Sequence, residues 1–116
     1  MDLVIEVYKS VRDFSKAETY GLTSQICRAA SSIPANIAEG SARFSNKEFS
    51  RFINIARGSA AELETHLEIC IRLEYIDKNV SKKLNADITE ISKMLYGLKK
   101  SLNTENSQLV TNNNVT

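Results

Sequence analysis

Apolar side chains recur every three to four residues over four stretches of the chain, which is the spacing of one face of an α-helix. The stretches run from Leu3 to Phe14, from Ile26 to Ile37, from Phe49 to about Tyr75 and from Val80 to Leu102. Each carries polar residues on its other face, so its apolar stripe needs a neighbour to be buried. Four such helices with short connections predict an all-α fold, an antiparallel up-and-down four-helix bundle.

Capping residues support the predicted helix boundaries. Ser45-Asn46-Lys47-Glu48 is a capping box and predicts the start of the third helix. Thr23 or Ser24 is the expected cap of the second helix, and Asp77 or Asn79 that of the fourth. Ser15 to Gly21 is predicted to connect the first two helices, and Gly40 to end the second near Ser41–Phe44.

The second helix contains the only proline of the chain, Pro34. Proline removes a backbone donor and crowds the carbonyl four residues earlier, so we expect a kink near Ala30–Ile33. The alternative is that one helix ends at Ile33 and another begins at Pro34. We favour the single kinked helix.

Small residues interrupt the apolar stripe of the third helix, at Ala56, Gly58, Ser59 and Ala60. They predict that another helix approaches closely there, which offsets the cost of a glycine in mid-helix. The chain beyond Asn103 is polar, rich in asparagine and without period. We therefore predict one bundle domain over residues 1–103 and a disordered polar tail over residues 104–116.

Charge is almost balanced over the whole chain, with a net charge of +1, but it is unevenly distributed. Thr23–Gly58 carries a net charge of +3, Ser59–Asn79 of −3 and Val80–Leu102 of +3. A mixed, solvated surface explains this pattern, and so does one basic face. The basic residues of the first of these segments are the candidate nucleic-acid contacts: Arg28, Arg43, Lys47, Arg51 and Arg57.

Catalytic and metal-binding patterns are absent from the sequence. His66 is the only histidine, stands on an acidic helix and is expected to be solvated. Cys27 and Cys70 lack metal-ligand spacing and are predicted to be buried free thiols. We expect no enzyme activity, no metal, no cofactor and no membrane span, and a cytoplasmic location without a signal peptide.

Polar residues nevertheless recur inside the helical stripes and predict a polar seam between the second and third helices. The seam residues are Gln25, Asn36, Glu39, Ser59 and Glu62. One interpretation is a hydrogen-bonded network that sets the helix register or forms a self-association interface. The other interpretation is a basic recognition surface formed by the arginines. Base stacking there has little support, because only Phe44, Phe49 and Phe52 stand among the arginines and the last two are expected in the core.

One run of the sequence carries a specific motif. From Tyr20 to Ile69 it reads YGLTSQICRAASSIPANIAEGSARFSNKEFSRFINIARGSAAELETHLEI. This run closely resembles the four-helix-bundle family of 23S ribosomal RNA intervening-sequence proteins, through YGLTSQ, SIPANIAEG with Arg43, KEF and the later GS pair followed by Glu62 and Glu64. The likeness covers about residues 8 to 76.

The resemblance implies a small bacterial, all-helical protein. A related branch, the accessory variability protein of diversity-generating retroelements, is a ring-shaped homopentamer that binds nucleic acid and a reverse transcriptase. The resemblance therefore implies a homo-oligomer, by analogy a pentamer. Cys27 stands where many members have a second arginine beside Arg28, and the retroelement branch is more basic, so weaker nucleic-acid binding is expected here.

Taken together, these observations predict a non-enzymatic, self-associating bundle that binds RNA or DNA weakly. The alternative is a structural or adaptor oligomer that binds a protein partner and has no nucleic-acid role.

Overall fold

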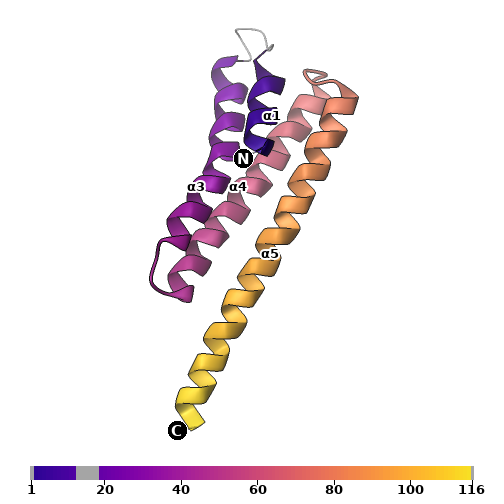
Figure 1. Cartoon of the computed structure of the whole chain (residues 1–116). Coiled ribbons are helices and arrows are strands. Elements are labelled where there is room, and N and C mark those ends of the chain that lie inside the picture. Colours follow the sequence, from indigo (N-terminus) through magenta and orange to yellow (C-terminus); the bar gives the residue numbers. More distant parts are fainter. Residues whose placement is uncertain (1, 13–18, 116) are drawn as a thin grey trace.

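The computed structural model describes residues 2–12 and 19–115, with side chains for residues 2–12 and 21–103. Its elements are α1 (Asp2–Val11), a π-helical turn η1 (Thr19–Thr23), α3 (Ser24–Ser41), α4 (Asn46–Arg72) and α5 (Lys78–Val115) (Figure 1). The described part of the chain contains helices and short connections and no strand. The predicted all-α bundle is confirmed. Most of the predicted connection from Ser15 to Gly21 lies outside the described residues.

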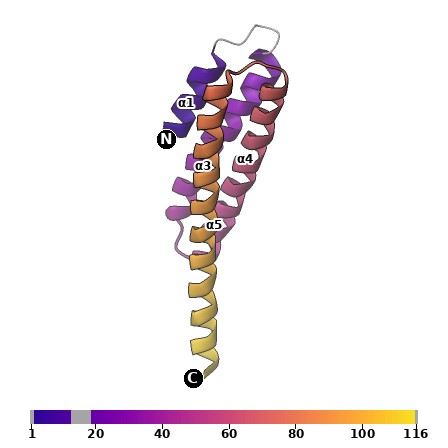
Figure 2. The ribbon, with the colours of Figure 1, turned by 90° about the vertical axis from the view of Figure 1, so that its right-hand side faces the viewer.

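The helices form an elongated bundle of 63 × 22 × 19 Å. The chain runs down through α3, up through α4 and down again through α5, and α4 packs against both neighbours (Figure 1). The short α1 lies against α3 and α5 and covers only the upper part of the bundle, while α5 extends beyond the other helices (Figures 1 and 2). The lower part therefore contains three helices where the upper part contains four.

The predicted apolar stripes build the core. Their buried members come from all four α-helices: Val7, Val11, Ile26, Ala29, Ala30, Ile33, Ile53, Ala56, Ala60, Leu63, Leu67, Cys70, Leu84, Ile88, Leu95 and Leu102. Tyr8 and Val80, also predicted in the stripes, are exposed. Tyr8 nevertheless forms a side-chain hydrogen bond with Cys27 of α3.

The predicted helix ends are largely confirmed. The Ser45 hydroxyl accepts a hydrogen bond from the Glu48 amide at 3.1 Å, as a capping box requires, and Asp77 accepts one from the Asn79 amide at 2.8 Å. The prediction that Thr23 or Ser24 caps α3 gives the correct start of the helix, since Thr23 is at the N-cap position, but the expected side-chain capping hydrogen bond is not formed. Thr23 has helical backbone angles because η1 leads directly into α3, and its buried hydroxyl has no hydrogen-bond partner among the described residues.

α3 passes through Pro34 as one continuous helix, which agrees with the first of the two alternatives. Asn36 donates a hydrogen bond to the Ser32 carbonyl at 2.8 Å and Ser31 donates one to the Cys27 carbonyl at 2.9 Å, so polar side chains support the backbone around the proline. The kink itself stays a prediction. α5 continues to Val115, and the domain boundary at residue 103 also stays a prediction.

The close helix approach occurs at a different glycine from the one expected. A Cβ atom on Gly40 would lie 2.7 Å from the Phe52 Cβ and 2.9 Å from the Phe49 Cδ1, so α3 and α4 meet there at glycine distance. Gly58 is exposed, and a Cβ atom there would have no heavy atom within 4 Å. The predicted approach at the small residues of α4 is found at Ala56, Ser59 and Ala60, which are buried, and the Ser59 hydroxyl lies 2.8 Å from that of Ser32 on α3. The expectation is wrong only for Gly58, which faces away from the neighbouring helices.

The end of α4 provides a stability prediction. Glu74 has a φ of 59°, which is a left-handed conformation. The Tyr75 amide donates a hydrogen bond to the Cys70 carbonyl at 2.9 Å, and the Glu74 amide donates one to the Ile71 carbonyl at 3.0 Å. This is a Schellman C-cap, which favours glycine at the left-handed position. We expect Glu74→Gly to raise the free energy of unfolding by about 0.5–1 kcal/mol, measured by urea denaturation. Glu74→Val should lower it, and a stabilised valine variant would contradict the cap assignment.

No helix in the described part of the chain is long and apolar enough to cross a membrane.

Candidate nucleic-acid interface

Three of the predicted basic contacts gather where α3 turns into α4. α3 ends at Ser41 and α4 begins at Asn46, so Arg43 lies in the connection, and Lys47 and Arg51 lie on the first two turns of α4. The guanidinium groups of Arg43 and Arg51 lie 5.0 and 4.9 Å from the centre of the Phe52 ring. We call Arg43, Lys47 and Arg51 the basic end of the bundle.

The aromatic residues of this end differ from expectation. Phe49 packs against the core, as predicted, but Phe52 is only half-buried and its ring is shared by the two arginines. Phe44, which follows Arg43 in the connection between α3 and α4, is fully exposed at 108% of its reference area. An aromatic side chain with no packing role in the single chain therefore stands beside three cationic ones.

Two carboxylates reduce the charge of the basic end. Glu39 pairs with Arg43 one helical turn away, and Glu48 lies 3.4 Å from Arg51. Both pairs are exposed, and such surface pairs contribute only about 0–1 kcal/mol each. Lys47 is exposed, and no ion pair to it occurs within the described side chains. The group keeps a net charge of +1, and its arginines can exchange carboxylate for phosphate at little cost.

The other two candidate contacts lie elsewhere. Arg57 lies over the Tyr96 ring of α5, 5.4 Å from its centre, on the other side of α4. Arg28 of α3 forms an ion pair with Glu62 of α4 and also donates to the Gln25 side chain at 2.9 Å. The structure therefore divides the predicted basic surface, and only the basic end forms a cluster.

The polar seam lies between α3 and α4. The Ser32 and Ser59 hydroxyl groups are 2.8 Å apart across the two helices, and Asn36 donates to the Ser32 hydroxyl at 2.9 Å. The Arg28–Glu62 pair continues the seam toward η1. Four of the predicted seam residues thus belong to it, whereas Glu39 lies at the basic end instead. The missed member, Ser32, stands one turn before Asn36, and that spacing was the available signal.

His66 corrects another expectation. Its side chain is only 20% exposed, and its Nε2 lies 3.5 Å from Glu62 Oε1. Both ring nitrogens are buried, and neither has a hydrogen-bond partner among the described residues. The residue is therefore not a solvated surface group, because the helix face that carries it is partly covered.

The two thiols are poorly placed for chemistry. Cys70 is buried, Cys27 is half-buried, and neither forms a disulfide bond within the described part of the chain. Burial raises the pKa of the Cys27 thiol, while a hydrogen bond with Tyr8 acts in the opposite direction. The thiol therefore stays protonated near neutral pH and is a poor nucleophile. The described side chains also contain no group of three His, Cys, Asp or Glu residues placed to hold a metal ion.

Comparison with known proteins agrees with the fold. A model of the 23S rRNA-intervening sequence protein family matches residues 1–97. Among solved structures, the chain is similar to a protein with unknown function from the S23 ribosomal protein family of Bacteroides thetaiotaomicron VPI-5482. The two share 35% identity and a TM-score of 0.75, over 84% of this chain and 88% of the other. Curated proteins give no significant match. The family resemblance inferred from SIPANIAEG and its neighbours is confirmed, and the chain belongs to the 23S rRNA-intervening sequence protein family.

Proposed function

We propose that this protein is a non-enzymatic, self-associating helical bundle of the cytoplasm that binds nucleic acid weakly at its basic end. The observation that carries the proposal is the grouping of Arg43, Lys47 and Arg51 beside the fully exposed Phe44. Cations supply affinity for any phosphate backbone, and an exposed ring supplies stacking for an unpaired base. The two features together favour a single-stranded or looped nucleic acid over a duplex.

Electrostatics predict weak binding. Glu39 and Glu48 leave the basic end with a net charge of only +1, although the positive end of the α4 dipole adds to its attraction for phosphate. Three phosphate contacts give a log–log salt slope of about −2 to −3 on duplex DNA and less on single strands. RNA is the first probe to use, since the family name refers to a ribosomal RNA.

A variant that lacks the three positive charges tests the basic end. We expect Arg43→Gln with Lys47→Gln and Arg51→Gln to lose nearly all binding to a labelled RNA hairpin and its salt dependence, because the phosphate contacts are gone. Fluorescence anisotropy at low salt measures this. The matched control is Arg72→Gln with Lys82→Gln and Lys93→Gln, which removes the same charge from exposed positions elsewhere. Equal losses in both variants would show that only net charge matters and would refute the site.

The outer face of α4 supports self-association. Residues separated by three, four and seven positions place Arg51, Ile55, Gly58, Thr65 and Ile69 along one side of this helix. Ile55 and Ile69 are exposed at 43% and 40%, and Gly58 has open space above it. A second copy lying across this face would bury both isoleucines and would approach closely at the glycine, which explains why a poor helix former is present there.

Analytical ultracentrifugation tests the assembly. By analogy with the retroelement branch we expect five chains of 13.0 kDa, hence a particle of about 65 kDa. Ile55→Lys with Ile69→Lys should shift the protein to the monomer, because two buried charges oppose the contact. Ile5→Lys with Val80→Lys, which alters exposed apolar residues on other helices, is the control and should leave the mass unchanged. An unchanged mass in the α4 variant, or a monomeric wild type, would overturn this part of the proposal.

A second candidate function is an adaptor that binds a protein partner without nucleic acid. The observation in its favour is the exposed apolar surface of α1, where Ile5 and Tyr8 are 51% and 47% exposed. Retained assembly together with no RNA or DNA binding at low salt would favour this candidate over the first.

A further inference from the structure

One side of the contact between α4 and α5 is polar. The Ser50 hydroxyl donates a hydrogen bond to the Asn103 side chain at 3.2 Å, and the Arg57 guanidinium lies over the Tyr96 ring, 5.4 Å from its centre. The two contacts are seven residues apart on both helices, which is two turns of antiparallel packing. We call the residues of these turns the α4–α5 flank: Ser50, Asn54 and Arg57 of α4 with Tyr96, Lys99 and Asn103 of α5.

The flank begins beside the basic end of the bundle. Lys47 of the basic end stands one turn before Ser50 in the same row of α4. Arg57 is ten residues beyond Lys47, a rise of about 15 Å along the helix. The row faces α5 and is a different side of α4 from the outer face that carries Ile55 and Ile69. The basic end and the flank therefore form one continuous surface.

The cations of the flank are not neutralised. Neither Arg57 nor Lys99 forms an ion pair with a carboxylate whose side chain the structure describes. The two helix segments that meet here, residues 49–61 of α4 and 91–103 of α5, contain no Asp or Glu. The flank therefore keeps both positive charges, whereas the arginines of the basic end share theirs with carboxylates.

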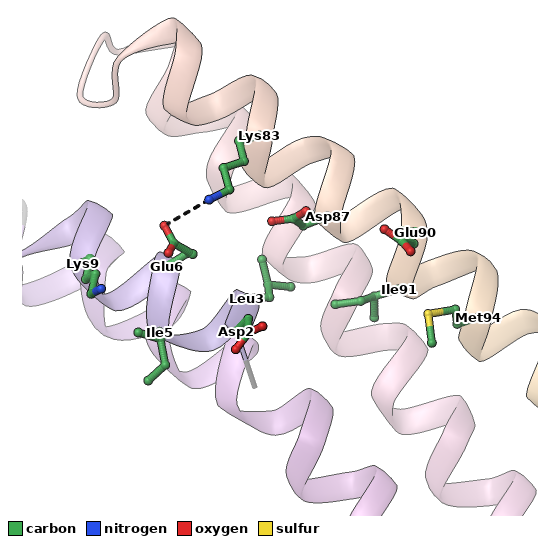
Figure 3. Close-up of a pocket in the computed structure, with 10 residues that line it drawn as sticks. All are labelled: Asp2, Leu3, Ile5, Glu6, Lys9, Lys83, Asp87, Glu90, Ile91 and Met94. Carbon is green, nitrogen blue, oxygen red and sulfur yellow. Dashed lines mark ion pairs between the residues drawn. The ribbon is translucent and has the colours of Figure 1, made fainter.

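The neighbouring carboxylates of both helices lie on other faces. On α5, Asp87 and Glu90 line a hollow between α1 and α5 and point toward α1 (Figure 3). On α4, Glu62 pairs with Arg28 of α3, and Glu64 lines a separate hollow nearer the upper end of the bundle. The charge of the flank thus results from how the helices pack, although the net charge of the chain is only +1.

Tyr96 adds an exposed ring to these cations. The residue is 57% exposed even though Arg57 lies against its ring. A ring beside cations therefore occurs twice on this surface, at Tyr96 and at Phe44 of the basic end. A nucleotide strand offers bases for both rings and phosphates for the cations between them. An acidic protein segment would pair with the cations but would leave both rings without a partner, so the surface fits a nucleic acid better.

We propose that a single-stranded nucleic acid bound at the basic end continues along the α4–α5 flank and stacks a second base on Tyr96, while Arg57 and Lys99 contact its phosphates. This inference rests on the proposed nucleic-acid function and extends the site from one ring to two. A stacked strand rises about 3.4 Å per nucleotide, so the distance from Lys47 to Arg57 takes about four to five nucleotides. Lys93, one turn beyond Tyr96, lies past the end of this path.

Two fluorescein-labelled oligouridines of different length test the path by anisotropy. A tetranucleotide is expected at the basic end, where three cations, Phe44 and the N-terminus of α4 act together, and it is too short when stacked to reach Tyr96 as well. A dodecanucleotide reaches both rings. We expect Tyr96→Ala to weaken dodecanucleotide binding by about 5- to 150-fold and to leave tetranucleotide binding unchanged. Tyr96→Phe keeps the ring and should bind both probes as the wild type does.

The phosphate contacts have a separate readout. Arg57→Gln with Lys99→Gln should reduce the log–log salt slope of dodecanucleotide binding by about 1.4, since each phosphate contact on a single strand contributes about 0.7. The matched control is Lys9→Gln with Lys82→Gln, which removes two positive charges from exposed positions away from the flank. Tyr8→Ala, which removes a ring of similar exposure from α1, is the control for Tyr96→Ala. Equal effects in the flank variants and their controls would overturn the inference.

The two probes separate this inference from the proposed function. If the tetranucleotide binds at the basic end and Tyr96→Ala leaves dodecanucleotide affinity unchanged, the path is wrong and the basic end stands. If neither probe binds at low salt, both proposals fail. Dodecanucleotide binding that survives removal of the three charges of the basic end would show that the flank binds alone, and would overturn the continuous path. A glutamate peptide whose binding depends on Tyr96 would assign the flank to an acidic protein segment instead.

Discussion

Replacing Gly40 by alanine is expected to lower the free energy of unfolding by about 1–3 kcal/mol. The added Cβ would lie 2.7 Å from the Phe52 Cβ, an atom fixed to the α4 backbone, so rotation of a side chain cannot relieve the contact. α3 and α4 would have to move apart near the connection that carries the basic end. This loss outweighs the gain of about 1 kcal/mol that alanine gives over glycine inside a helix.

Gly97→Ala provides the matched comparison. This glycine is also helical and exposed, and a Cβ atom there would have no heavy atom within 4 Å. The substitution should therefore raise stability by about 1 kcal/mol, through helix propensity alone. Urea denaturation of both variants measures the two effects. Stabilisation by Gly40→Ala would show that the two helices do not approach as closely as the structure describes.

Phe44→Ala is expected to weaken binding of a single-stranded oligonucleotide by about 5- to 150-fold, since stacking on one aromatic ring contributes about 1–3 kcal/mol per base. Stability should not change, because the ring is fully exposed and packs against nothing in the single chain. Binding to a duplex should change little, as its bases are already stacked. Anisotropy with matched single- and double-stranded probes measures the difference.

Two controls define the role of the ring. Phe44→Trp keeps an aromatic face and should keep the affinity, whereas Tyr8→Ala removes an exposed aromatic side chain from α1 and should have no effect. If Phe44→Ala binds single strands as well as the wild type, base stacking is not part of the function. The basic end would then contact phosphates alone.

Local signals in the sequence predicted the parts of this structure that depend on local physics. The spacing of Ile53, Leu63 and Leu67 determined which face of α4 is buried, because helical period alone sets it. The Ser45 cap was predicted for the same reason, since the hydroxyl bonds an amide only three residues away. The family motif was also recognisable, because SIPANIAEG is contiguous.

The errors concern contacts between helices. Helical spacing alone does not show how far Phe52 and His66 are covered, because that depends on how the neighbouring elements pack on α4. The four-residue connection between α3 and α4 brings Arg43 over the Phe52 ring, so this ring contacts two guanidinium groups. The choice between Gly40 and Gly58 as the point of close approach has the same cause. Both are helical glycines, and only helix register distinguishes them.

The candidate site was predicted in its composition but not in its grouping. Arg28 and Arg57 were as plausible as Arg43 from charge alone, yet one pairs with Glu62 across the seam and the other lies over Tyr96. The hollow between α1 and α5 had no sequence signal, because Asp2 and Asp87, which both line it, are far apart in the chain and come together only when α1 packs on α5.

The central claim is that nucleic acid binds at the connection between α3 and α4. Amide chemical shifts of the nitrogen-15-labelled protein, recorded while a short single-stranded RNA is added at low salt, test it most directly. We predict shift changes confined to residues 43–52 that saturate with added RNA and vanish as salt is raised. The absence of any change, or changes centred on residues of other parts of the bundle, would contradict the account.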